Sequence, residues 1–143
     1  MDTEKTHELE QYVNVLLKRA SDFIDPNGYR GSVFFTDQSQ KYYEGAFIYY
    51  DQDEYHYFNN DRGNIRDRRS TESMDEAAYW VLHRIIINYY PSKTKEKREP
   101  STRDSRRDWF AFLLSAHRAI GEYFYEREKA DIEETLKKYP YRD

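Results

Sequence analysis

Residues 46–59 read AFIYYDQDEYHYFN, and this stretch decides the fold expected for the chain around it. Ala46–Tyr50 and Tyr55–Asn59 are short alternating runs rich in aromatic or β-branched residues, which is typical of β-strands. Between them, Asp51-Gln52-Asp53-Glu54 forms a four-residue connection suited to a hairpin. Ser32–Thr36 shows the same alternation. The sequence therefore predicts a small antiparallel sheet of about three strands.

Helical patterns flank the predicted sheet on both sides. One apolar stripe with helical spacing precedes it, comprising Leu9, Tyr12, Val13, Leu16, Leu17 and Ala20. After the sheet, Ser73 stands three residues before Glu76 as a capping box that opens a helix, and Pro91 is expected to end it. A third helix restarts near Asp104, and Gly121 separates it from a fourth. The prediction is an α+β fold with an N-terminal helix, the sheet and three C-terminal helices.

The stripes on these helices also predict the core and a loop. Ser92–Pro100 is charged and lacks apolar residues, so we expect an exposed loop there. The core is expected to include Trp80, Leu82, Ile85, Trp109, Phe110 and Leu113.

Length and composition indicate one soluble domain over residues 1–143. Charged residues make up 35% of the chain, but an aromatic share of 17% can fill a core. The absence of cysteine excludes disulfides, thiolate metal sites and thiol nucleophiles. Residues 1–10 are charged, and no stretch approaches the roughly 20 apolar residues that a membrane span needs. We therefore expect a cytoplasmic protein with no membrane partner.

The net charge of −4 is unevenly distributed. Residues 1–60 carry a net charge of −6 and residues 61–143 a net charge of +2. A nucleic-acid-binding protein presents its bases on one face without nearby acids. Here acids such as Asp67, Glu96 and Asp108 interrupt the basic clusters, so no nucleic-acid partner is expected.

Patterns that carry catalysis are absent from the sequence. The four histidines have no metal-ligand spacing, and five glycines leave little capacity for a phosphate-binding loop. His56 could act as a general base, but an exposed or cross-strand-paired histidine is the more frequent case. His117 lies on an apolar helix face and is interpreted as a hydrogen-bonded core residue. The sequence predicts no catalytic residue, no cofactor and no metal site, so the protein is not expected to be an enzyme.

Tyrosines and acids are concentrated between Asp37 and Asp61. This stretch holds six tyrosines, six acids and a single base, Lys41. Tyrosine supplies contact area at low entropic cost and is enriched where proteins meet, and clustered acids suit a basic partner. For any single tyrosine, half-burial on a sheet face is the simpler explanation. The predicted contact residues are Tyr49, Tyr50, Asp51, Asp53, Glu54, Tyr55 and Tyr57.

A second motif, Asp104-Ser105-Arg106-Arg107-Asp108-Trp109-Phe110, links the chain to a known family. Together with Tyr55-His56-Tyr57, Asp61-Arg62-Gly63 and the terminal Pro140-Tyr141-Arg142-Asp143, it resembles the bacterial immunity protein 63 family over roughly residues 40–143. Members of that family are thought to protect a cell from a cognate polymorphic toxin.

The resemblance implies that the partner is a cognate toxin domain, held by stoichiometric capping. A nuclease would suit the acidic hairpin, which would mimic the acidity of its substrate. Because each immunity protein must fit a different toxin, the shared motif is interpreted as structural, through Asp104, Arg106, Arg107 and Phe110. The alternative is a small adaptor or regulatory binding module with an unrelated partner.

Overall fold

The computed structural model describes residues 1–27, 32–42, 44–94 and 104–143. Along the chain the elements are α1 (Thr3–Arg19), β1 (Val33–Phe34), a short 3-10 helix η1 (Ser39–Lys41), β2 (Gly45–Asp51), β3 (Glu54–Asp61), β4 (Asn64–Thr71), α2 (Met74–Thr94), α3 (Arg106–Ile120) and α4 (Glu122–Lys138). The predicted α+β class is confirmed. None of the helices in the described ranges is long and apolar enough to span a membrane.

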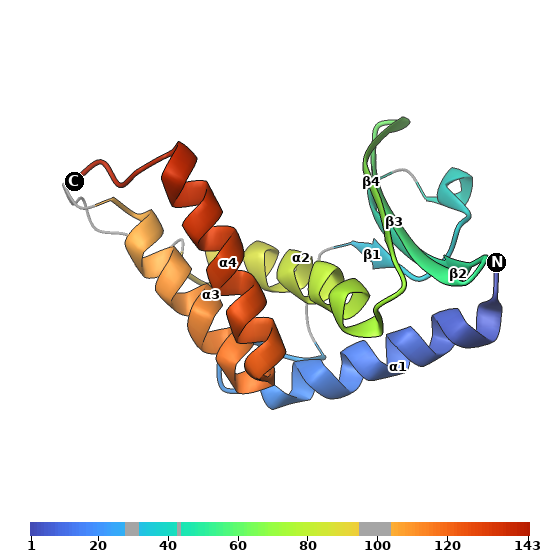
Figure 1. Cartoon of the computed structure of the whole chain (residues 1–143), viewed down its shortest axis with the longest axis horizontal. Coiled ribbons are helices and arrows are strands. Elements are labelled where there is room, and N and C mark those ends of the chain that lie inside the picture. Colours follow the sequence, from blue (N-terminus) through green and yellow to red (C-terminus); the bar gives the residue numbers. More distant parts are fainter. Residues whose placement is uncertain (28–31, 43, 95–103) are drawn as a thin grey trace.

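Helix α1 forms where the apolar stripe predicted it. The side chain of Asp2 accepts a hydrogen bond from the backbone N–H of Lys5 at 2.9 Å and caps the first turn. Leu9, Val13 and Leu16 are buried on the inner side of the helix. Figure 1 shows α1 running beneath the sheet at one end and beneath the C-terminal helices at the other, so one helix supports both halves of the fold.

The sheet contains four strands in the order β1-β2-β3-β4. Strands β2, β3 and β4 are antiparallel neighbours, whereas β1 pairs with β2 in parallel. The expectation of about three antiparallel strands was therefore wrong in count and in the direction of β1. A parallel pair needs a crossover rather than a tight turn, and the local pattern of Ser32–Thr36 carries no information on strand direction.

Strand β4 was missed because its sequence is polar except for Ile65. All of Asn64–Ser70 is exposed, so no alternation of apolar and polar residues marks the strand. The turns on either side of β3 are tighter than expected. Gln52-Asp53 and Arg62-Gly63 each have two successive residues with positive φ, the pattern of two-residue hairpin turns that follow the twist of the strands. The predicted four-residue connection is thus a two-residue turn.

Helix α2 begins as predicted but ends later. The hydroxyl of Ser73 accepts a hydrogen bond from the backbone N–H of Glu76 at 3.1 Å, which confirms the cap. The helix then continues through Pro91 to Thr94. Proline removes one backbone donor, and so near the end of a long packed helix it costs a single bond without stopping the last turn. Residues 92–94 of the predicted loop are therefore helical, and residues 95–100 lie outside the described residues.

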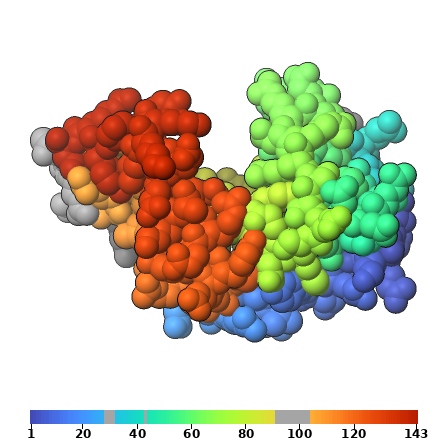
Figure 2. All heavy atoms as spheres, in the orientation of Figure 1, coloured from blue at the N-terminus to red at the C-terminus, as the bar shows by residue number. Residues whose placement is uncertain are grey.

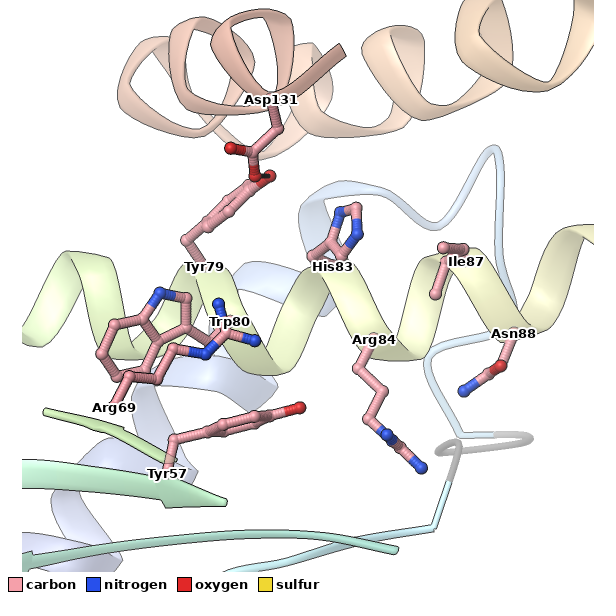
Figure 3. Close-up of a pocket in the computed structure, with 9 residues that line it drawn as sticks. All are labelled: Tyr57, Arg69, Tyr79, Trp80, His83, Arg84, Ile87, Asn88 and Asp131. Atoms are coloured by element: carbon pink, nitrogen blue, oxygen red, sulfur yellow. Dashed lines mark hydrogen bonds between the residues drawn. The ribbon is translucent and has the colours of Figure 1, made fainter. Parts of the chain in front are cut away.

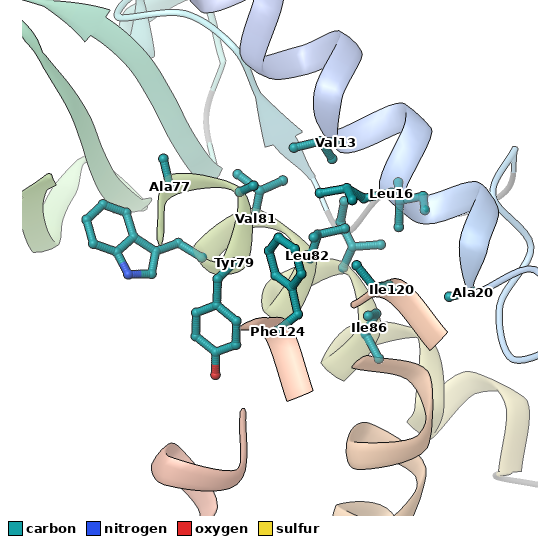
Figure 4. Close-up of a cluster of buried hydrophobic side chains, with 14 of the residues drawn as sticks. Val13, Leu16, Ala20, Ala77, Tyr79, Val81, Leu82, Ile86, Ile120 and Phe124 are labelled. Carbon is teal, nitrogen blue, oxygen red and sulfur yellow. The ribbon is translucent and has the colours of Figure 1, made fainter. Parts of the chain in front are cut away.

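The core is continuous along α1 and α2, which pack on the inner face of the sheet at one end and on α3 and α4 at the other, and α2 contacts all of these layers. Figure 4 shows side chains of α1, such as Val13 and Leu16, meeting Leu82 and Ile86 of α2. The core prediction is confirmed at Trp80, Leu82, Ile85, Phe110 and Leu113, which are all buried. Trp109 is an exception: it is half-buried and packs against the core from its edge.

Candidate functional site

The β2–β3 hairpin sorts its tyrosines between two faces. Residues paired across the strands share a face, and the pairs Ile48–Tyr57 and Tyr50–Tyr55 belong to the inner one. Tyr55 is 5% exposed and Tyr57 is 3% exposed, so both rings are core residues. Tyr50 is half-buried against Tyr55, with ring centroids 4.8 Å apart. Neither Tyr55 nor Tyr57 presents a ring surface to a partner in this structure.

The outer face of the hairpin carries a second aromatic cluster. Phe47 and Phe58 are buried there and stack at 5.1 Å. Tyr49 is only half-buried and stacks on His56 at 5.2 Å. Burial raises the pKa of the Tyr49 hydroxyl, and the carboxylate of Asp37 adds to the effect. Of the four predicted contact tyrosines, Tyr49 has the ring that lies at this outer surface.

His56 is fully engaged within the sheet. Its Nδ1 lies 2.9 Å from the hydroxyl of Ser70, and its Nε2 lies 2.9 Å from the backbone oxygen of Asp51. A carbonyl only accepts hydrogen bonds, so Nε2 carries the proton and donates. Both nitrogens are therefore used to tie β3 to its neighbours, as the cross-strand interpretation predicted.

The acids of the hairpin turn are joined by acids from the start of α1. The backbone N–H of Asp2 donates to Tyr50 O at 2.8 Å, and the backbone N–H of Tyr50 donates to the Thr6 hydroxyl at 2.9 Å. These bonds hold the first turns of α1 beside the β2–β3 turn. Lys5 and the amino group of Met1 lie in the same region, the latter 3.7 Å from Asp51. We name the acids of these two adjoining segments the acidic end: Asp2, Glu4 and Glu8 at the start of α1, and Asp51, Asp53 and Glu54 at the β2–β3 turn.

The Asp104-x-Arg106-Arg107 motif fastens the C-terminal segment to the start of α3. The Arg106 guanidinium donates to the Asp104 carboxylate at 2.8 Å and to the backbone oxygens of Tyr139 and Pro140, both at 2.8 Å. Arg107 donates to Asp143 at 2.7 Å. Hydrogen bonds from Arg106 hold the pKa of the Asp104 carboxyl well below its usual value. These contacts support the structural interpretation of the motif.

We expect Arg106→Ala to release the C-terminal segment while leaving the domain folded. The substitution removes donors to two backbone oxygens and to Asp104, so amide exchange at Arg142, whose N–H donates to Asp104, should accelerate about tenfold or more. Hydrogen exchange followed by mass spectrometry checks this. Lys137→Ala, at the end of α4 next to the C-terminal segment but without these contacts, should leave the exchange unchanged. Equal protection in Arg106→Ala and the parent chain would contradict the fastening role.

Three helices bring a buried polar cluster together. Glu128 of α4 is 1% exposed, and its Oε2 lies 2.6 Å from Nδ1 of His83 and 3.6 Å from Nε2 of His117. The hydroxyl of Tyr79 lies 2.8 Å from the same oxygen and 2.6 Å from Asp131. Burial by itself raises the pKa of the Glu128 carboxyl, but the hydrogen bond and charge of His83 outweigh it and the net shift is downward.

The cluster adjoins a pocket on the molecular surface. Figure 2 shows the surface hollowed between the β3–β4 hairpin and α4. The pocket has a volume of about 280 Å³. Figure 3 shows Tyr79 and His83 on α2 at its α4 side, with Asp131 above them, and Tyr57 and Arg69 at its sheet side.

Comparison with known proteins places the chain in a family. The model of the family "Immunity protein 63" matches residues 51–134, which is more than half of the chain. The chain is therefore a member of the immunity protein 63 family. The match runs from the β2–β3 turn through β3, β4, α2 and α3 into α4. Neither a curated protein nor a solved structure matches it.

Within this immunity protein, sequence reasoning missed two features of the site. The acids of α1 join the turn acids through hydrogen bonds of the Tyr50 backbone to Asp2 and to the Thr6 hydroxyl, residues more than 40 positions away in the sequence. The cluster of His83, His117 and Glu128 likewise draws one residue from each of three helices. Neither grouping has a local spacing that could reveal it. The only sequence signal was the helical phase of His117, which correctly predicted a buried, hydrogen-bonded histidine.

Proposed function

We propose that this protein neutralises a cognate toxin domain by binding it stoichiometrically through the acidic end and Tyr49. Membership of the immunity protein 63 family supports a toxin partner. The observation that carries the choice of surface is the junction of the β2–β3 turn with the first turns of α1. This junction brings the six acids of the acidic end to the end of the sheet at the β2–β3 turn. The half-buried ring of Tyr49 on the outer face of β2 supplies apolar contact area.

The charge of this surface favours a basic partner surface. A nuclease toxin presents such a surface to the phosphates of its substrate, and an acidic cap would compete for it. The buried rings of Tyr55 and Tyr57 contribute by supporting the hairpin from below, since both pack within the core. Tyr50 supports it in the same way from a half-buried position. The contact residues of the proposal are therefore Tyr49, Asp51, Asp53 and Glu54, with Asp2, Glu4 and Glu8 from α1.

The test uses the cognate toxin domain, sought first in the gene next to the one for this chain and immobilised for kinetic binding measurements at two salt concentrations. The triple variant Asp51→Asn, Asp53→Asn, Glu54→Gln removes charge but keeps shape, and asparagine tolerates the positive φ at residue 53. Stability should stay within about 0.5 kcal/mol of the parent. Association should slow by about tenfold or more at low salt and lose most of its salt dependence.

The matched control is Glu126→Gln, Glu133→Gln, Glu134→Gln, which changes the net charge by the same amount on the exposed face of α4. It should leave association close to that of the parent chain. In contrast, Tyr49→Ala should raise the dissociation rate roughly 30-fold, since central aromatic anchors act mainly on dissociation. Unchanged kinetics in both hairpin variants would move the contact elsewhere, first to the exposed strand around Arg62–Arg69. Absence of binding by the parent chain would contradict the toxin partner itself.

A further inference from the structure

The buried cluster contains a histidine nitrogen without a hydrogen-bond partner. Nδ1 of His117 lies 2.7 Å from the backbone oxygen of Leu113, and because that oxygen only accepts, Nδ1 carries the proton. Nε2 is fully buried and has no hydrogen-bond partner among the described residues. In the neutral ring its lone pair points into the cluster, 3.6 Å from Glu128 Oε2. Two electron-rich atoms thus face each other with nothing positive between them.

The hydrogen bond of Nδ1 fixes both the tautomer and the orientation of the His117 ring. The fixed hydrogen bond of Nδ1 to a backbone oxygen is the arrangement commonly found for metal-bound histidines, where it sets the tautomer and aims Nε2 at the ion.

The cluster also has an excess of negative charge. Tyr79 has one proton to share between the carboxylates of Glu128 and Asp131. The Arg127 guanidinium donates to Asp131 at 2.6 Å and to Glu76 at 2.7 Å. Its single positive charge therefore lies beside two carboxylates, and Tyr79 links one of them, Asp131, to Glu128. When both imidazoles are neutral, as metal ligands must be, the carboxylates of Glu76, Glu128 and Asp131 together with Arg127 sum to a charge of −2. A divalent cation would balance it.

The donor atoms have the spacing of a metal site. The three ligand atoms of His83, His117 and Glu128 lie within 4.8 Å of one another. Donors about 2.0–2.1 Å from a tetrahedral ion are about 3.3 Å apart, close to the 3.6 Å between His117 and Glu128. The 2.6 Å contact of His83 would have to open by less than about 1 Å. His83 is 32% exposed at the pocket wall and has room to shift.

We propose that His83, His117 and Glu128 form a binding site for a divalent transition-metal ion, best matched by Zn²⁺. Two imidazole nitrogens and one carboxylate oxygen suit Zn²⁺, whereas Mg²⁺ and Ca²⁺ prefer oxygen ligands alone. Binding requires His83 to release or relocate its Nδ1 proton. Asp131 or a water molecule from the pocket completes the coordination. Helical spacing in one segment could not predict this site, because its ligands come from α2, α3 and α4.

The site is tested by titrating the full chain, freed of metal by a chelator, with ZnCl₂ in a calorimeter. We expect one ion per chain, and a loss of affinity of about 100-fold or more in His83→Asn and in Glu128→Gln. His7→Asn is the matched control, because His7 is an exposed histidine 3.7 Å from Glu10 on α1. It should bind like the parent. At free zinc of 100 times Kd, the parent should melt about 8 °C higher or more, and His83→Asn should not.

Cobalt supplies an independent readout of the coordination. Co²⁺ in the parent chain should give the intense visible bands of a tetrahedral site, and Glu128→Gln should lose them. The proposal is overturned if the parent binds no zinc, if His7→Asn weakens binding as much as His83→Asn, or if bound Co²⁺ keeps the weak spectrum of the hydrated ion. If Glu128→Gln fails to fold, His83→Asn alone tests the proposal. The His83 side chain lines the pocket and is partly exposed, so its substitution leaves the core intact. No toxin enters these measurements, so their outcome is independent of the proposed function.

Discussion

Replacing Phe110 with alanine is expected to cost about 3–5 kcal/mol of unfolding free energy, which is among the largest effects of any single substitution in this chain. Phe110 is 6% exposed and lies near the start of α3, where its ring stacks on Trp109 and approaches Tyr141 at 6.3 Å. Truncation removes apolar contact area and leaves a cavity that helix α3 can fill only partly. Urea unfolding monitored by circular dichroism measures the loss.

Tyr139→Ala is the control for this prediction. Tyr139 is 61% exposed and follows α4, and its backbone oxygen, which accepts from Arg106, is unaffected by the substitution. Its cost should stay within about 0.5 kcal/mol. A loss below about 1 kcal/mol for Phe110→Ala would mean that α3 is not packed on the core as described.

Gly45→Ala is expected to cost about 2–5 kcal/mol by breaking the junction between β1 and β2. Gly45 has a backbone φ of +144°, which residues other than glycine rarely adopt. A Cβ at this position would also lie 2.3 Å from the backbone oxygen of Ser32 and 2.7 Å from the ring of Phe34. Rotation of a side chain cannot relieve the contact with Ser32, so the segment leading into β1 must move.

Gly63→Ala separates the two causes of that loss. Gly63 has a φ of +88°, but a Cβ there would meet no atom within 4 Å. This control keeps the backbone strain, worth about 1 kcal/mol, and lacks the clash. Thermal and urea unfolding of both variants gives the difference, and amide exchange at Ala46, whose N–H donates to Ser32 O, reports on the junction. Equal costs for the two variants would show that the β1–β2 contact adds nothing to stability.

The hairpin shows how far sequence patterns reach into a functional surface. The sequence predicted the two strands, the concentration of acids at the turn and the abundance of tyrosine. It offered no means of telling Tyr49 from Tyr57, because both lie in aromatic runs with the same local pattern. In the structure Tyr57 packs under Trp80 with ring centroids 5.9 Å apart, and Tyr49 lies on the opposite face of the sheet. Which face the helices cover depends on the packing of α1 and α2 against the sheet.

What the sequence by itself determined is local: α1, the β2–β3 hairpin, the cap at Ser73 and the apolar faces of α3 and α4. Each depends on the periodicity of side chains along one segment, which is present in any short window of the chain. Tertiary structure alone decided the parallel pairing of β1, the addition of the polar strand β4, and the meeting of His83, His117 and Glu128. These features depend on contacts between segments far apart in sequence, where burial on one element is completed by residues of another.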